Sequence, residues 1–346
     1  ATTSFTVGLE QVLPQGNTKL YLLLFSLAFF AAVLLFALRP GKILVWVGKV
    51  LNPCFLLFLA VLIVSAMLHP TAAVADVAPE GKYAAQPFFT GFLEGYNTMD
   101  ALASLAFGII VVQVIRDLGV QEPGAIAGST VRAGVMSCLL MALIYVAVAV
   151  IGAQSRGALP AAANGGVAFA QIARYYLGNT GLIVLAATVT LACLKTAVGL
   201  ITGCAETFSA LFEKGPSYKA WAITFSAVSF IFANLGLDAI IKYSVPVLML
   251  LHPIAIMLIV LTLCGGLFKN DPVVFRWTIT FTAIASIYDM FAALPKGLWS
   301  ALHGEEIQAV AEKLLPLAGQ GLGWLCPAAL GLVIGLAIHI YRLRKA

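Results

Sequence analysis

Charge is what this sequence has least of. Asp, Glu, Lys and Arg make up 10% of the 346 residues, whereas a soluble domain carries about 25%. Apolar residues reach 61% and the mean hydropathy is +1.00, so too few polar side chains remain to cover a water-facing surface. In a bilayer the requirement is reversed, because backbone groups are satisfied within helices while side chains stay apolar. The composition therefore argues against a soluble all-α protein and predicts an all-α polytopic membrane protein.

Signatures of catalysis and of metal binding are also missing. The sequence has no HExxH motif, Ser/His couple or paired carboxylates, and no basic stretch with interleaved aromatics that would bind nucleic acid. The cysteines lack CxxC spacing and are interpreted as small apolar packing residues; they lie at positions 54, 138, 193, 204, 264 and 326. We therefore expect that this protein is not an enzyme, needs no cofactor and binds no nucleic acid. Its surroundings would be membrane lipids.

A signal peptide is missing as well. The opening ATTSFTVGLEQVLP has no initiator Met and no charged first region. It is typical of the last turns of a helix followed by a loop. We therefore expect residues to precede Ala1.

Long apolar runs dominate what is present. Runs of about 20 residues cross a hydrocarbon core of about 30 Å. Nine are found, at residues 18–38, 43–68, 88–115, 134–153, 181–212, 219–237, 239–267, 273–294 and 321–341. They predict a single transmembrane domain over 1–346 with about nine helices, whose two ends lie on opposite sides of the membrane.

The basic residues predict the orientation of these helices, because Lys and Arg concentrate in cytoplasmic loops. One set of alternate loops and the C-terminus hold Arg39, Lys42, Arg116, Arg132, Lys214, Lys219, Lys269, Arg276, Arg342, Arg344 and Lys345. The other set holds Lys19, Lys82, Arg156, Arg174, Lys242, Lys296 and Lys313. The first set is larger, so we expect a cytoplasmic C-terminus. The loops 69–87, 154–180 and 295–320 then face outward, and the last of them would suit an amphipathic surface helix.

Polar residues cluster at the start of the third apolar run, in GFLEGYNTMDALASLAFG at 91–108. The cluster consists of Glu94, Asn97, Thr98, Asp100 and Ser104. These positions do not share one helical face, so a continuous helix would expose some of them to lipid. A broken helix would instead turn them and its freed backbone groups toward a cavity. The segment predicts a broken helix within 88–115; a capped helix start at the membrane surface is the alternative.

A second polar feature is a stripe on the run 181–212. Six small or polar residues fall within about 80° of arc at about 100° per residue: Thr188, Ala192, Lys195, Gly199, Thr202 and Glu206. Lys195 lies roughly 21 Å from the outer end at about 1.5 Å per residue, so it must face a polar interior or release its proton. Helix packing remains an alternative for the stripe, because Gly199 and Gly203 form a GxxxG pair that lets another helix approach.

A third charged residue is Asp289, in SIYDMFAAL near the outer end of its run. An intramembrane position and a surface position are equally open for it. His252 and His339 are interpreted as structural. Pro246 and Pro253 interrupt their run, and we expect them to kink it.

Four segments of the sequence are similar to those of a known family. GFLEGYNTMDALASLAFGIIVV, LRPGK at 38–42, ACLKTAVGLITGCAETF at 192–208 and NLGLDAIIKYSVPVL at 234–248 closely resemble the bacterial branched-chain amino acid:cation symporter family (BrnQ or LIVCS). The resemblance runs from Ala1 almost to the C-terminus. It implies a LeuT-like fold of two inverted five-helix repeats plus two helices. By that resemblance residue 1 falls near the end of the third helix, so the chain would be a partial LeuT-like fold without its N-terminal part.

The resemblance also implies residue roles. The run 88–115 would be a broken helix with its break near 96–101, holding the amino and carboxylate groups of the substrate. The substrate residues would be Glu94, Tyr96, Asn97, Thr98, Met99, Asp100, Ala101 and Leu102. Met99, Ala101 and Leu102 would line the pocket for its aliphatic side chain. The run 181–212 would supply the cation site and its coupling residues, Thr188, Lys195, Thr196, Thr202 and Glu206.

Lys195 departs from that family pattern. The resemblance implies Thr-Thr in many members where this chain has Lys195-Thr196, although the first position also tolerates an apolar residue. Either the ammonium occupies or borders the sodium site, so that coupling uses protons or no ion, or Lys195 points into water and Na⁺ still binds through Thr196.

The expected function is secondary transport of leucine, isoleucine and valine across the bacterial inner membrane, coupled to Na⁺ or H⁺ by alternating access. A related transporter of another small amino acid or neutral solute is the alternative. An ion channel would show rings of charge or a filter loop, and neither is visible.

Overall fold

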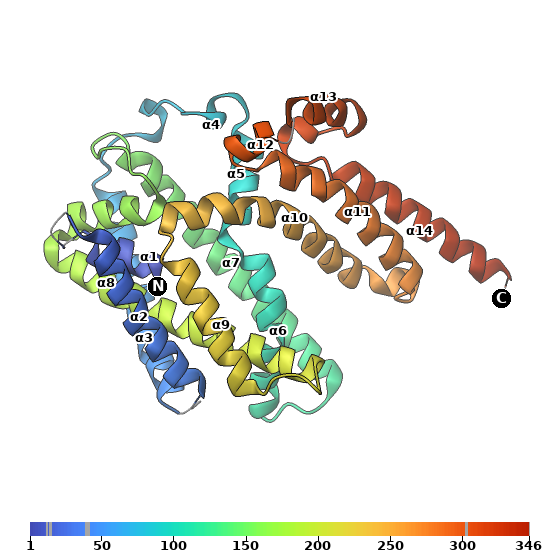
Figure 1. The fold of residues 1–346 in the computed structure, drawn as a ribbon, viewed down its shortest axis with the longest axis horizontal. Coiled ribbons are helices and arrows are strands. Elements are labelled where there is room, and N and C mark those ends of the chain that lie inside the picture. The colour runs from blue at the N-terminus through green and yellow to red at the C-terminus, as the bar shows by residue number, and fades with distance from the viewer. Residues whose placement is uncertain (12, 14–15, 39–41, 302–303, 346) are drawn as a thin grey trace. The chain divides into compact units, whose positions relative to one another are not determined.

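A computed structural model describes residues 1–11, 13, 16–38, 42–301 and 304–345. Every regular element within these ranges is helical, as the composition predicts (Figure 1). The chain forms two compact units. The first unit comprises Ala1–Ala78 and Val111–Ile240, and the second comprises Pro79–Ile110 and Ile241–Ala346.

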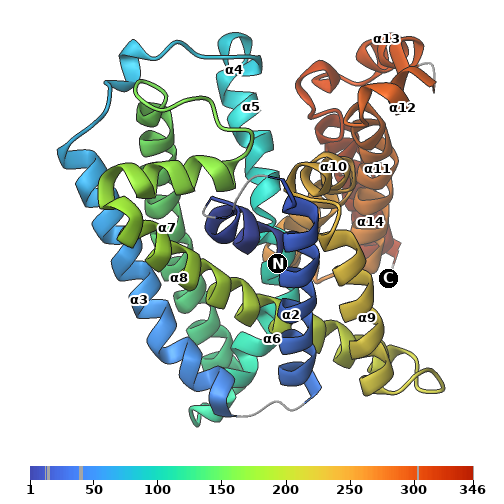
Figure 2. The same ribbon diagram turned by 60° about the vertical axis from the view of Figure 1, so that its left-hand side comes forward.

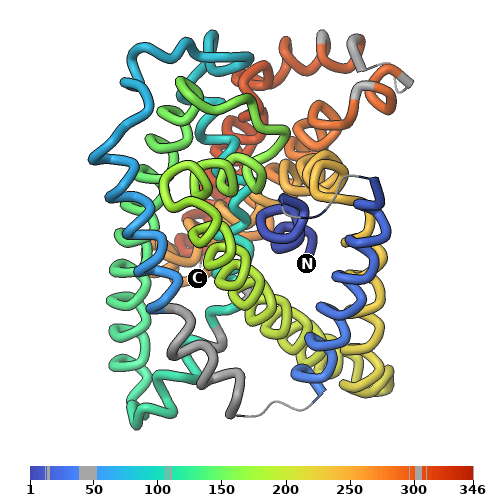
Figure 3. The backbone as a smooth tube through the Cα atoms, turned by 90° about the vertical axis from the view of Figure 1, so that its left-hand side faces the viewer, coloured from blue at the N-terminus to red at the C-terminus, as the bar shows by residue number. Residues whose placement is uncertain are grey.

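The first unit is organised around one long helix, α8. Its elements are α1 (Thr2–Ser4), η1 (Phe5–Leu9), α2 (Thr18–Leu38), α3 (Lys42–Leu68), η2 (Val74–Asp76), the end of α6 (Asp100–Asp117), α7 (Pro123–Ser155), α8 (Gly165–Leu211), α9 (Tyr218–Ala233) and the start of α10 (Leu237–Leu263). Helix α8 packs against η1, α2, α3 and α9. Figure 3 shows α2 beside α9, in blue and yellow. The short helix η1 packs closely on α8. A Cβ added at Gly8 of η1 would lie only 2.7 Å from the Cβ of Ala186 on α8.

Helix α8 corrects one expectation about the loops. Residues 154–180 are an outer loop by sequence, but α8 begins at Gly165, where the Asn164 side chain accepts a hydrogen bond of 3.1 Å from the Val167 amide. The helix is kinked at Gly178, whose φ is 63° and ψ −161°. Positive φ of this kind favours glycine. From the sequence alone, however, a glycine inside an apolar run does not show whether the helix ends there or continues in a new direction.

The second unit contains the predicted broken helix and the C-terminal helices. Its elements are α4 (Lys82–Ala85), α5 (Pro87–Glu94), η3 (Gly95–Thr98), the start of α6, most of α10, η4 (Gly265–Phe268), α11 (Pro272–Ala292), α12 (Lys296–Ala301), α13 (Gly304–Leu314), η5 (Ala318–Gln320) and α14 (Leu325–Lys345). Helices α12 and α13 follow α11 in the expected outer loop 295–320 (Figure 2). The helix α13 lies where the sequence suggests an amphipathic one: its Ala311 is buried, whereas Gln308 and Lys313 are exposed.

Helices α11 and α14 form the closest helix pair of the second unit. A Cβ on Gly331 would lie 2.7 Å from the Trp277 carbonyl oxygen, and one on Gly335 would lie 2.8 Å from Val274 Cα. Gly331 and Gly335 thus form a GxxxG pair that admits the α11 backbone. By contrast, a Cβ on Gly203 would have no neighbour within 4 Å, so the described surroundings of Gly203 do not show the close approach that its motif suggests.

Five helices of the described chain are long and apolar enough to cross a membrane: α2, α7, α8, α10 and α14. Two apolar stretches, Pro53–Leu68 and Tyr218–Ala233, are shorter. The polytopic class is therefore confirmed, whereas the count of about nine transmembrane helices stays a prediction. All six cysteines are free thiols, but five of them are exposed, which differs from the expectation that they pack in the interior.

Candidate functional site

The predicted helix break lies where the sequence places it, between α5 and α6. Helix α5 ends at Glu94, the 3₁₀ turn η3 follows, and α6 begins at Asp100. Met99 joins them with left-handed backbone, at φ 59° and ψ 12°. Its amide donates a hydrogen bond of 3.1 Å to the Tyr96 carbonyl. The chain therefore interrupts the helix within the expected segment 96–101.

Two polar side chains fix the shape of this break. The Asn97 amide nitrogen donates to Glu94 Oε2 at 2.6 Å, and the Thr98 hydroxyl donates to the Gly95 carbonyl at 2.8 Å. The amides in the first turn of α6, like those of any helix, have no acceptor four residues earlier within it. The carbonyl end of α5 carries partial negative charge and the amide end of α6 partial positive charge. A break of this kind offers both charges needed for an amino-acid zwitterion.

Tyr96 and Met99 face different surroundings within the break. The Tyr96 side chain is 4% exposed and stacks on the His252 ring at 4.6 Å with an interplanar angle of 4°. Met99 is 45% exposed. Tyr96 is therefore held by packing inside the second unit, whereas the Met99 side chain is free to contact another molecule.

The predicted coupling residues lie on the straight part of α8, in the first unit. The Thr188 hydroxyl is buried and donates to the carbonyls of Val184 and Leu185 at 2.7 and 3.1 Å. The Thr196 hydroxyl donates to the Ala192 carbonyl at 3.1 Å and its residue is exposed. The remaining members are Lys195 and Thr202, both half-buried, and Glu206, which is exposed. All five predicted coupling residues thus lie on α8 in the first unit. The helix break between α5 and α6 belongs to the second unit.

A buried carboxylate in the second unit belongs to neither predicted set. Asp289, near the end of α11, is 3% exposed, so it is buried inside the protein. The sequence contains a signal for this burial, because Thr278, Thr282, Ser286 and Asp289 follow at helical spacing. The three hydroxyl residues are fully buried, and each donates to the carbonyl four residues earlier at 2.7–2.8 Å. Asp289 therefore ends a buried polar stripe on α11.

An apolar groove of about 600 Å³ lies on the same unit between α11, α13 and the start of α14. Phe281, Ile284, Ile307, Val310 and Leu314 supply much of its lining. It lacks the matched donors and acceptors that a zwitterion needs. No group of three potential metal ligands from His, Cys, Asp and Glu is found in the described part of the chain.

Comparison of the sequence with known proteins identifies the family of this chain. Residues 1–342 match the family model described as branched-chain amino acid transport protein. A branched-chain amino acid permease BrnQ of Lactobacillus delbrueckii subsp. lactis is 48% identical over 94% of this chain and 72% of its own length. The BrnQ permease of Bacillus subtilis is 36% identical over 99% of this chain and 76% of its own length.

A third relative is named as a carrier protein. The branched-chain amino acid transport system 2 carrier protein of Pseudomonas aeruginosa is 38% identical over 97% of this chain and 74% of its own length. No solved structure matches the chain significantly.

Proposed function

Because this chain belongs to the branched-chain amino acid transport protein family, and is a transporter rather than an enzyme, we propose that it imports leucine, isoleucine and valine across the bacterial inner membrane by cation-coupled alternating access. The single observation that supports this proposal most is the helix break between α5 and α6. Irregular backbone at membrane depth is tolerated where it lines a cavity or binds a ligand.

The two ends at the break would hold the polar part of the substrate. The carboxylate would accept hydrogen bonds from the first-turn amides of α6, at Asp100, Ala101 and Leu102, because a helix start attracts anions. The ammonium would lie toward the carbonyl end of α5 and the Glu94 carboxylate, which is exposed. Asn97 and Thr98 would keep the break in shape through their hydrogen bonds to residues 94 and 95.

The aliphatic side chain of the substrate would contact Met99, Ala101 and Leu102. Met99 is exposed and the other two are half-buried, so their apolar groups are available to a ligand. One methylene in an apolar pocket is worth about 1–3 kcal/mol. Leucine, isoleucine and valine would therefore compete for one site with affinities that differ moderately.

The coupling cation, Na⁺ or H⁺, would act through the α8 stripe of Thr188, Lys195, Thr196, Thr202 and Glu206. By the family resemblance Lys195 stands at a position of threonine, so its ammonium would occupy or border the sodium site that the resemblance implies. Coupling would then use protons. The rival arrangement leaves Na⁺ on the Thr196 hydroxyl, whose residue is exposed.

The transport cycle would follow the LeuT-like pattern. A bundle containing the broken helix would rock against a scaffold and open the site alternately to each side. The cation would supply the differential affinity that shifts the population between the outward and inward states. The C-terminus after α14, with Arg342, Arg344 and Lys345, would be cytoplasmic.

Counterflow of labelled leucine tests the proposal without any ion gradient. Proteoliposomes holding the full-length protein are loaded with unlabelled leucine and diluted into labelled leucine. We expect a transient internal overshoot of label that isoleucine and valine suppress and that alanine and lysine leave intact. Absence of an overshoot, or suppression by every amino acid alike, would contradict the assignment.

A further inference from the structure

Three polar side chains from separate parts of the second unit meet around one apolar cluster. The cluster contains Ala285, Leu322 and Trp324, with Phe89 and Leu93 packed against it. Asp289 lies one helical turn after Ala285 on α11. Tyr96 follows Leu93 by three residues on the α5–η3 segment, so it lies on the same side of that helix.

None of these polar groups is satisfied. Both carboxylate oxygens of Asp289, the Tyr96 hydroxyl and the Trp324 indole nitrogen are buried without a hydrogen-bond partner. The side chains of Tyr96 and Trp324 face each other but do not reach hydrogen-bonding geometry. Buried polar groups are nearly always paired, so these four atoms indicate a cluster that can take up a small ion or adopt a second arrangement.

Among the side chains that the structure describes, no lysine or arginine lies beside Asp289. The backbone amides of Gly323 and Trp324 lie against its carboxylate outside hydrogen-bonding geometry, and a Cβ on Gly323 would lie 3.1 Å from Oδ1. The other titratable groups around it are Tyr96 on η3, His252 of α10 stacked behind Tyr96, Tyr288 on α11 and Glu312 on α13. None of them is a lysine or an arginine. A buried carboxylate without a counter-charge costs several kcal/mol. Since the described neighbours supply none, an ion from solution would neutralise it.

The hydrogen-bond donors around the Asp289 carboxylate indicate which ion neutralises it. The amides of Gly323 and Trp324 lie at the carboxylate, and Trp324 Nε1 lies at the Tyr96 hydroxyl, so the groups gathered here are N–H and O–H donors. A sodium ion needs several oxygen ligands, and N–H dipoles that point at it would repel it. These same donors would stabilise an ionised carboxylate once they closed on it, and a proton neutralises it in the arrangement seen here.

We propose that Asp289 is a proton-binding site of the transport cycle, with Tyr96 and Trp324 as the donors that close on it when it ionises. The proton would come from water on one side of the membrane and return to water on the other. Tyr96 belongs to the turn that breaks the helix, so its movement toward Asp289 would shift Met99 and the first turn of α6. Proton and amino acid binding would then be linked reciprocally. The inference rests on the proposed transport function.

The test compares proteoliposomes of the full-length wild type, Asp289→Asn and Asp289→Glu, with Asp117→Asn as a matched exposed carboxylate. Leucine counterflow without a gradient, leucine accumulation driven by an imposed pH gradient, and leucine-linked proton movement are measured for each. We expect Asp289→Asn to keep counterflow within about threefold and to lose accumulation and proton movement. Asp289→Glu should recover part of both, and Asp117→Asn should behave as the wild type.

Several outcomes would overturn the proton site while leaving the transport function standing. They are wild-type accumulation driven by sodium alone, undiminished pH-driven accumulation by Asp289→Asn, and loss of counterflow in a folded Asp289→Asn protein. Absence of counterflow in the wild type would instead remove the transport function itself.

A second variant keeps the test decisive if Asp289→Asn does not fold. Tyr96→Phe removes only a hydroxyl that would stabilise the ionised carboxylate. We expect it to shift the pH of half-maximal driven uptake upward, because the carboxylate would then bind its proton more readily. An unchanged pH profile would contradict the arrangement.

Discussion

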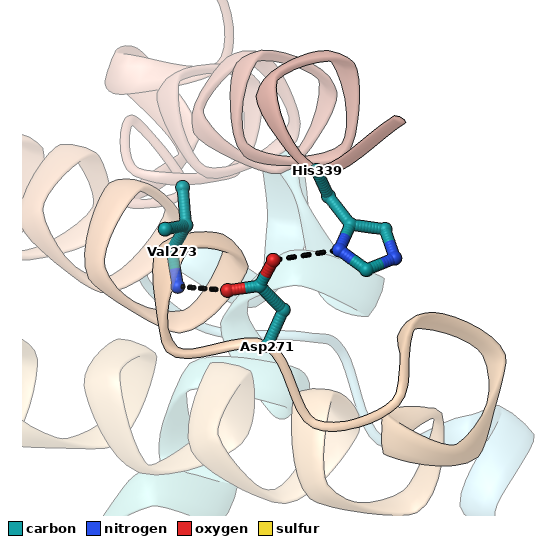
Figure 4. Close-up of polar contacts among 3 residues, drawn as sticks. All are labelled: Asp271, Val273 and His339. Atoms are coloured by element: carbon teal, nitrogen blue, oxygen red, sulfur yellow. Dashed lines mark hydrogen bonds and ion pairs between the residues drawn. The ribbon is translucent and has the colours of Figure 1, made fainter. Parts of the chain in front are cut away.

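The Asp271 side chain joins the start of α11 to the last turns of α14. Its Oδ2 lies 2.6 Å from His339 Nδ1, and its Oδ1 accepts a hydrogen bond of 2.9 Å from the Val273 amide (Figure 4). Asp271 is thus the N-cap of α11 and at the same time holds α14 beside it. His339, which the sequence suggests is structural, has this partner outside the candidate site.

The Asp271 contact predicts a dependence of stability on pH. The Val273 amide, followed by His339, lowers the pKa of Asp271 below its usual value. A group with a lowered folded pKa stabilises the protein above its unfolded pKa, near 4, and loses that contribution as the pH falls through the folded pKa. We expect Asp271→Asn in detergent to lower the Tm by about 2–4 °C at pH 7, with a smaller difference below about pH 4.

Asp117→Asn is the control, because that carboxylate accepts only a hydrogen bond of 3.2 Å from the exposed Gln113 side chain. Its Tm should equal that of the wild type. Equal melting of Asp271→Asn and wild type across the pH range would show that the contact contributes nothing.

The close approach of α14 to α11 predicts that Gly331 accepts no side chain. A Cβ there would lie 2.7 Å from the Trp277 carbonyl oxygen and 3.0 Å from Thr278 Cα. We expect Gly331→Leu to destabilise the protein by at least the roughly 1–3 kcal/mol of an overpacked core, seen as a lower Tm and a lower yield in membranes. Gly128→Leu is the matched control, because Gly128 on α7 has open space around it. Similar behaviour of the two variants would contradict the packing of this helix pair.

The backbone of Met99 predicts which residues the helix break tolerates. Its φ of 59° is unfavourable for any L residue and most unfavourable for a β-branched one. Met99→Ile should lower the Tm and leucine counterflow together, at a cost of about 1–3 kcal/mol, whereas Met99→Gly should keep the Tm within a few degrees. Met136→Ile, at an exposed position within α7, controls for the loss of methionine. If Met99→Ile melts as the wild type does, the break does not need this backbone.

Lys195 predicts the dependence of transport on sodium. If its ammonium takes the place of Na⁺, leucine uptake by the wild type should be the same in sodium and in choline buffers at equal pH. Lys195→Thr should then gain a sodium dependence of several-fold, because it restores the hydroxyl pair with Thr196. Full sodium dependence of the wild type would remove this hypothesis and favour Na⁺ on Thr196.

The helix break is the part of the site that local sequence defines best. Gly91 and Gly95 weaken the helix, and the polar residues between 94 and 104 cannot share one face, so the residues themselves conflict with a continuous span. The kink at Gly178 has no such signal, because an apolar helix continues on both sides of it. Likewise, the sequence contains GxxxG pairs at 199–203 and 331–335, and only the neighbouring helix decides which of them is close-packed.

The cluster of Asp289, Tyr96 and Trp324 was beyond local sequence reasoning for another reason. Its members are separated by up to 228 positions, and each lies in an apolar stretch where it has an ordinary explanation. Only the folding of α5, α11 and the turn before α14 around one apolar cluster brings them together. The spacing of Thr278, Thr282, Ser286 and Asp289 indicates a buried face on α11, but it does not indicate what that face meets.

The central claim, that this protein drives branched-chain amino acids uphill with a cation, is tested most directly by gradient-driven uptake. Proteoliposomes of the full-length protein receive labelled leucine under an inward proton gradient, an inward sodium gradient, or neither. Internal leucine should rise well above the external concentration under at least one gradient and only equilibrate without it. Equilibration under all three conditions would contradict the claim, because it would show a passive pathway.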